Sequence, residues 1–447
     1  MATRLFFLST LAAALLVVAI VRPAPVQEDP RWDLLTHHEI GADRFKAAYP
    51  DLDGKGVVIA VLDTGVDMGA EGLRRLPDGK VKVIDVRDFS TEGDLFWKEA
   101  RIVPGGDGEK VVDAEGRGLS HFRAVAADAY PERFYLGFIE EAKFADADVK
   151  DLNGDGDTTD VFGILIFTVR EPAPEEAGTK KAEGDTDAGA EEKAPAKAGA
   201  LRYVAVIDVN GDGKLDDGVR VTDYWRSHDT FVLAGKKGAR RQLTFAANFY
   251  PEEGRLSLHF DSGGHGTHVA GIAAGHRIHG QDGYDGLAPG ARVLSLKIGN
   301  NRYSGGATVT ESIKKALDYA VEYATKHKVP IVYNMSFGIG SEVETKSAID
   351  VYVDELLWKN PGVVFVTSAG NEGPGLSSVG MPGTATRAIS VGALLGPEAA
   401  HAQYGFPLKA EVAFPFSSRG GDTFKPDILA PGSASSTVPL WGERDHY

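Results

Sequence analysis

The sequence contains no cysteine. This absence excludes disulfide bonds, thiolate zinc sites and a cysteine nucleophile. Positive charge is also in deficit, since 48 lysines and arginines stand against 64 aspartates and glutamates and give a formal net charge of −16. So acidic a balance argues against a nucleic-acid partner and mainly favours solubility. The hydrophobic fraction of 43% is usual for a globular protein with a large core.

The N-terminus holds an apolar run with export character. Residues 1–24 begin with Arg4, continue through the apolar stretch Leu5–Ile20 and end at an Arg-Pro-Ala-Pro break that starts at Arg22. This pattern is typical of a signal peptide, and an uncleaved N-terminal anchor is the alternative. Either interpretation predicts that the rest of the protein is secreted or extracytoplasmic, with no other membrane association.

Short apolar runs and helical patterns alternate along much of the chain. The runs Val57–Leu62, Val329–Tyr333 and Val363–Val366 each end abruptly in polar residues or glycine. Between runs, apolar residues recur with helical spacing, as at Ile313, Leu317, Ala320 and Ala324. Strand–helix–strand alternation predicts an α/β fold with a doubly wound parallel sheet. Ligands of such sheets bind at the carboxyl ends of the strands, where these polar residues stand.

A β-rich insertion is expected where the alternation stops, over residues 92–255. Within it, residues 171–200 are almost entirely Glu, Ala, Lys, Pro, Gly, Asp and Thr, a composition that predicts a disordered linker. The α/β domain then falls into two parts, residues 25–91 and 256–447, on either side of the insertion.

Two polar residues stand out for chemistry. Asp63 closes the first apolar run, where it could orient a partner or simply cap the next helix. His265 lies in Gly-His-Gly-Thr-His-Val-Ala-Gly, among small residues that let a helix start pack closely. His265 and His268 are spaced for zinc, but no His-Glu-x-x-His pattern accompanies them, so a metal is not expected here.

The segments DTGVD, GHGTHVAG, NMSFG, SAGNEG and KPDILAPG occur in this order. Together they resemble the sequence blocks of the subtilisin family of serine proteases, over about residues 45–90 and 260–435. The resemblance implies a subtilisin-like fold, protein or peptide substrates, and no cofactor for the chemistry. It implies Asp63 as the triad aspartate, His265 as the general base and Asn371 as the side-chain donor of the oxyanion hole. It also implies that Ser336, Phe337 and Gly338 pair with the substrate backbone.

The nucleophile of this family lies in a Gly-Thr-Ser-Met-Ala block shortly after the Ala-Pro-Gly motif. No Gly-Thr-Ser occurs in the sequence, and Ser433, Ser435 and Ser436 lie too close to Gly432 to match it. The chain as given is therefore expected to bind peptides without cleaving them, although its family is that of serine peptidases.

The long separation of Asp63 from His265 resembles the tripeptidyl peptidase II branch of the family. Members that remove tripeptides hold the substrate's amino end with glutamates, and this sequence has Ile339 and Ala307 near those places. Glu342 and Glu344 are close enough to leave that alternative open. We expect an endopeptidase, with a tripeptidyl aminopeptidase and an inactive peptide-binding fragment as alternatives. Ser304-Gly305-Gly306 resembles the opposite edge of the substrate site.

The insertion carries Asp151-Leu-Asn-Gly-Asp-Gly and Asp208-Val-Asn-Gly-Asp-Gly. Alternating oxygen ligands with glycine at the sixth place resemble the first half of a calcium loop. The twelfth places hold Phe162 and Val219 instead of glutamate, so turns rich in Asp, Asn and Gly explain the pattern equally well. Structural calcium and simple turns both stay open, and the metal ligands are unknown.

Overall fold

A computed structural model of the protein describes residues 35–171, 199–235, 243–303, 308–340 and 343–442. The expected signal or anchor segment and most of the expected linker lie outside these residues. Within them, no helix is long and apolar enough to cross a membrane.

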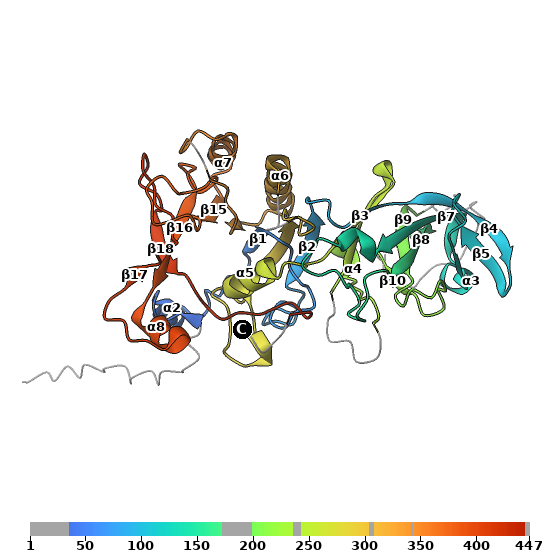
Figure 1. Cartoon of the computed structure of the whole chain (residues 1–447), viewed down its shortest axis with the longest axis horizontal. Coiled ribbons are helices and arrows are strands. Elements are labelled where there is room, and N and C mark those ends of the chain that lie inside the picture. Colours follow the sequence, from blue (N-terminus) through green and yellow to red (C-terminus); the bar gives the residue numbers. More distant parts are fainter. Residues whose placement is uncertain (1–34, 172–198, 236–242, 304–307, 341–342, 443–447) are drawn as a thin grey trace, which may run out of the picture.

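A parallel sheet forms the centre of the molecule (Figure 1). Its strands run in the order β17-β16-β15-β14-β1-β13-β2, β18 also pairs with β16, and every pairing except that of β17 is parallel. In this order the bounds are Val412–Ala413, Ile389–Leu395, Val363–Ser368, Ile331–Met335, Val58–Asp63, Arg292–Lys297 and Val83–Asp88, with β18 at Ile428–Pro431.

Helices cover both faces of this sheet around β1. Alternate residues of β1 point to opposite sides, so Ala60 packs with α6 and α7 while Val61 packs with α5. The whole of β1 is therefore buried, as its uninterrupted apolar sequence requires. The α helices are α2 (Ala42–Ala48), α3 (Phe122–Val125), α4 (Tyr224–Ser227), α5 (His265–Ala274), α6 (Thr310–His327), α7 (Ala348–Lys359) and α8 (Pro397–Tyr404).

Two antiparallel sheets fill the region between β2 and α5, which extends away from the central sheet in Figure 1. The larger has the order β10-β9-β8-β7-β4-β5-β6, and the smaller has the order β11-β12-β3. Their bounds, in these orders, are Val219–Val221, Leu201–Ile207, Val161–Arg170, Ala129–Glu140, Lys98–Gly105, Gly108–Val112 and Gly118–Ser120, then Ala246–Tyr250, Arg255–His259 and Asp94–Phe96.

These sheets pack around their own apolar clusters, in which Phe162, Ile164 and Phe245 are almost completely buried. The α/β class with a β-rich insertion is thus confirmed. The boundaries that we placed at residues 92 and 255 stay predictions. Strand β3, inside the expected insertion, pairs with β12, which begins at the second boundary.

Candidate active site

The carboxyl ends of β1, β14 and β15 lie at one edge of the central sheet, since the three strands are parallel neighbours. Asp63 is the last residue of β1, Ser336 follows β14 directly, and Asn371 comes three residues after β15. The topology therefore brings together polar residues from distant parts of the sequence at the edge where such sheets bind ligands.

Asp63 and His265 form the central pair of this edge. The Nδ1 atom of His265 lies 2.8 Å from Oδ1 and 3.0 Å from Oδ2 of Asp63. The Asp63 side chain is almost completely buried, whereas 56% of the His265 side chain is exposed. The hydrogen bond to Asp63 raises the pKa of His265, against the smaller effect of burial. The carboxylate thus fixes one ring nitrogen and stabilises the imidazolium, while the rest of the ring faces the cleft.

A second carboxylate holds the start of helix α5, on which His265 is the first residue. Asp261 is buried and accepts hydrogen bonds from the backbone N–H groups of Gly264 (2.8 Å) and Thr267 (3.1 Å) and from the Thr267 hydroxyl. It also accepts one from the Thr64 hydroxyl, at 2.8 Å. These bonds satisfy N–H groups that a helix start leaves without partners and tie them to the residue after Asp63.

Glycine at position 266 is a geometric requirement of the same pair. A Cβ atom there would lie 2.0 Å from the Gly65 carbonyl oxygen and 3.0 Å from the Asp63 Cβ. Any larger residue would push α5 away from β1 and lengthen the contact between Asp63 and His265.

A buried ion pair lies beneath the site. The ammonium of Lys297, at the end of β13, is 3.0 Å from the Glu92 carboxylate, and both side chains are fully buried. Lys297 also donates to the carbonyl oxygen of Thr64, and Glu92 accepts from Ser262 (2.9 Å) and from the Asn301 backbone (2.8 Å). The pair therefore connects the segments that follow β1, β2, β12 and β13.

A cavity of about 300 Å³ opens at the pair. Asp63 and His265 line it together with Ser336 and Phe337, two of the three residues predicted to pair with a substrate backbone. Gly338 follows them and is exposed. Asp148 of the insertion also lines this cavity.

Asn371 lies on the loop after β15 and does not line the cavity. Neighbouring backbone groups fix this loop, because Glu372 N donates to the Ser418 hydroxyl (3.0 Å) and Ser418 N donates to the Gly370 carbonyl (3.1 Å). Asn371 itself is exposed at the same edge of the sheet as Ser336. Asn371 is thus an exposed residue on a loop that hydrogen bonds hold in place.

Residues 54–445 match the subtilase family, peptidase S8. The chain belongs to this family. It is 32% identical to tripeptidyl-peptidase 2 of Oryza sativa subsp. japonica over 91% of this chain and 32% of that protein. It is 28% identical to pyrolysin of Pyrococcus furiosus over 87% of this chain and 29% of that protein. The crystal structure of tripeptidyl peptidase 2 superposes with a TM-score of 0.58 and 25% identity, over 80% of this chain and 30% of that one.

This subtilase thus spans about a third of the length of the curated relatives that it matches. The predicted family and its tripeptidyl peptidase II branch are confirmed by these comparisons. Membership makes the chain a serine peptidase by family.

Glu344, which the sequence left open as a ligand for a substrate's amino end, is buried. Glu344 accepts hydrogen bonds from the backbone of Gly421 (2.8 Å) and Thr423 (2.8 Å) and from the Thr423 hydroxyl. These bonds lower its pKa, although burial acts in the opposite direction. Its two oxygens are therefore engaged within the protein. Glu342, Ala307 and the Ser304-Gly305-Gly306 segment lie outside the described residues.

The three serines after Gly432 lie in a segment that passes over α5. Ser436 is buried and donates to the carbonyl oxygen of His268 at 2.7 Å. Further along, the Trp441 indole donates to the carbonyl oxygen of Asp261 at 2.6 Å. Within the part of the chain that the structure describes, the His265 ring forms its hydrogen bonds with Asp63 and with none of these serines.

Carboxylates also gather at the first of the two Asp-rich loops. One oxygen each of Glu141, Asp157 and Asp160 lies within 4.8 Å of the others, so this group could hold a cation. Both loops close in the same way, with Asp151 accepting from Gly154 N (2.6 Å) and Asp208 from Gly211 N (2.9 Å). The twelfth-place residues Phe162 and Val219 lie in β8 and β10, as members of the sheet.

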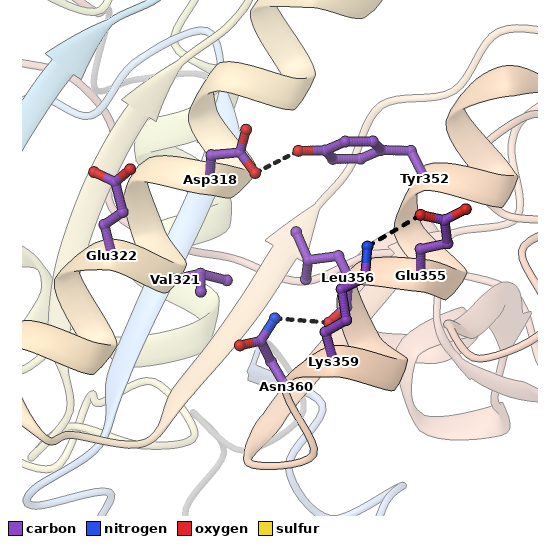
Figure 2. Close-up of a pocket in the computed structure, with 8 residues that line it drawn as sticks. All are labelled: Asp318, Val321, Glu322, Tyr352, Glu355, Leu356, Lys359 and Asn360. Atoms are coloured by element: carbon purple, nitrogen blue, oxygen red, sulfur yellow. Dashed lines mark hydrogen bonds and ion pairs between the residues drawn. The ribbon is translucent and has the colours of Figure 1, made fainter.

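A separate cavity of about 210 Å³ lies between α6 and α7 (Figure 2). Two of its three carboxylates are engaged with neighbours: Asp318 accepts from the Tyr352 hydroxyl, and Glu355 accepts from Lys359 at 3.2 Å, while Glu322 is the third. It shares no lining residue with the cavity at Asp63.

Four residues of the site were missed by sequence reasoning. Asp261 carried a signal, because an Asp shortly before a helix start is a capping residue. The sequence gives no such signal for the other three, Glu92, Lys297 and Asp148. Each looks like an ordinary surface charge in the sequence, and only the fold places it beside the site.

The buried pair gives a stability prediction. We expect Lys297→Met to lower the free energy of unfolding by about 3–5 kcal/mol, because it leaves the buried Glu92 carboxylate without its cation. Burial raises the pKa of Asp88 to about 6, and Lys297 opposes that rise. Without Lys297 this pKa should rise further, so Asp88 takes up its proton at a higher pH in the variant than in the unmodified protein. The part of the deficit that comes from Asp88 should therefore shrink as the pH falls toward 6.

Urea unfolding at several pH values measures this deficit. Lys98→Met is the matched control, since Lys98 pairs with Glu115 at the surface, where both side chains are about half exposed, and should cost less than about 1 kcal/mol. Equal losses in the two variants would show that the Lys297–Glu92 pair does not support the site.

Proposed function

We propose that this subtilase is an endopeptidase that hydrolyses peptide bonds through an Asp-His-Ser triad with Asp63 and His265 as two members. The observation that carries the proposal is the 2.8 Å contact between His265 Nδ1 and the buried Asp63. This arrangement leaves Nε2 free to take the proton of a serine hydroxyl as that hydroxyl attacks the scissile carbonyl.

Each remaining step has a residue suited to it. His265, once protonated, gives its proton to the leaving amine. A water molecule then attacks the acyl-enzyme, with His265 again taking a proton, from the water, and returning it to the serine oxygen. Asn371 donates its amide N–H to the oxyanion that forms on the carbonyl oxygen. In subtilisin, loss of this donor costs about 10²–10³ in turnover. Ser336, Phe337 and Gly338 pair with the substrate backbone along the cleft.

Two observations favour cleavage inside chains over removal of tripeptides. Ile339 is an exposed apolar residue whose backbone is paired with that of Met381, and the Glu344 carboxylate is engaged by residues 421–423. A buried ammonium without an anion is penalised by several kcal/mol. Tripeptidyl aminopeptidase activity is the second candidate, and the names of the relatives from Oryza sativa subsp. japonica and Arabidopsis thaliana favour it.

Peptide cleavage tests this proposal in a form of the protein that carries the family's Gly-Thr-Ser segment. One peptide with a free and with an acetylated amino end should be cut at the same internal bonds at equal rates. His265→Ala should lower turnover by roughly 10⁴–10⁶, the range known for triad members of subtilisin. His268→Ala, one turn further along α5, is the control and should retain most of the turnover.

The opposite results are equally clear. If acetylation abolishes cleavage and the products appear in threes, the protein is a tripeptidyl aminopeptidase. If His265→Ala loses less than tenfold while the fold is intact, the base is another residue.

We further propose that the group Glu141, Asp157 and Asp160 binds a structural calcium ion, since Ca²⁺ prefers carboxylate oxygens. Added calcium should raise the melting temperature by a few degrees, because a ligand of the native state stabilises it. Asp160→Asn should abolish this shift, whereas Asp217→Asn in the second loop should retain it. Equal melting curves with calcium and with a chelator would contradict the proposal.

A further inference from the structure

The insertion contributes a carboxylate to the cleft. Asp148 lies on the segment between β7 and β8 and lines the same cavity as Asp63, His265, Ser336 and Phe337. It is therefore a residue of the insertion that stands where a bound peptide would pass.

The position of this carboxylate is fixed by its neighbours. Ala147 and Val149, on either side, are each only 1% exposed and belong to the apolar core of the insertion. The backbone N–H of Ala147 also donates to the Phe144 carbonyl at 2.9 Å. Because the flanking residues are anchored in a core, the exposed Asp148 side chain is held at the cleft wall.

The charge of Asp148 is not compensated from within the cleft. Asp148 forms no recorded hydrogen bond or ion pair with another residue of the described ranges, and no lysine or arginine lines the cavity. The other two ionisable residues that line it, Asp63 and His265, are paired with each other. The cleft thus presents one carboxylate that is free to meet a substrate group.

We propose that Asp148 is a specificity-determining residue that binds the cationic side chain of a lysine or arginine in the substrate. This inference rests on the proposed function, because it assumes that a peptide occupies the cavity beside His265. A cation a few ångströms from Asp148 is attracted more strongly than at an open surface, since the cavity walls exclude part of the water.

Peptide binding to the whole 447-residue chain tests the inference. Three fluorescent peptides of otherwise neutral sequence serve as probes: one acetylated, one with a free amino end, and one acetylated with a single internal lysine. Fluorescence anisotropy gives the Kd of each for the unmodified protein, for Asp148→Asn and for Asp146→Asn. Asp146 is the matched control because it is exposed on the same segment and does not line the cavity.

The peptide with the internal lysine should bind about three- to tenfold more tightly than the neutral one, in the range of a partly shielded ion pair. This preference should vanish in Asp148→Asn, persist in Asp146→Asn and weaken with added salt, while the Kd of the neutral peptide stays unchanged. A gain by the peptide with the free amino end alone would assign Asp148 to the amino end of the substrate and overturn the inference.

Two other outcomes also overturn the inference. A neutral peptide that binds without any preference for charge, or a preference that survives in Asp148→Asn, overturns it while leaving the proposed function intact. Absence of binding by all three peptides overturns the proposed function and this inference together.

Discussion

The hydrogen bond between Asp63 and His265 joins residues that are 202 positions apart in the sequence, and most features of the site serve this contact. It requires β1 to end at Asp63 and α5 to begin at His265, with the two elements closer than a side chain at position 266 would allow. The buried Asp261 fixes the start of the helix from below. His265 needs its position relative to Asp63 to be fixed in this way, because the carboxylate sets the tautomer of the ring and stabilises its charge.

The insertion takes part in the site and is more than an appendage on the catalytic fold. Glu92, at its beginning, forms the buried pair with Lys297, which in turn binds the carbonyl of the residue after Asp63. Asp148, from its middle, reaches the wall of the cleft. Of these two carboxylates, Glu92 is buried next to the segment that follows Asp63, and Asp148 lines the cavity at His265.

Sequence patterns predicted the parts of the structure that depend on local spacing. The apolar run that ends at Asp63 is β1, and Ile313, Leu317 and Ala320 do form the buried face of α6. The small residues around His265 predicted the close packing of its helix start, whereas its pairing with Asp63 was implied by the family resemblance. Patterns failed where the environment is tertiary: Val364, in an apolar run, is 41% exposed in β15, and Lys297 is fully buried against Glu92. Periodicity carries no information on which distant segment will cover a strand or neutralise a charge.

The most direct test of the central claim is an NMR titration of the His265 ring in the unmodified chain and in Asp63→Asn. Asp63 holds the pKa of His265 above its ordinary value of 6.5, so the pair contributes stability below pH 6.5 that is lost as the pH rises through the raised pKa. Asp63→Asn should lower this pKa to or below 6.5, since burial then acts without the Asp63 carboxylate against it, whereas Asp146→Asn, outside the cavity, should leave it unchanged. A His265 pKa that is the same with and without Asp63 would contradict the account.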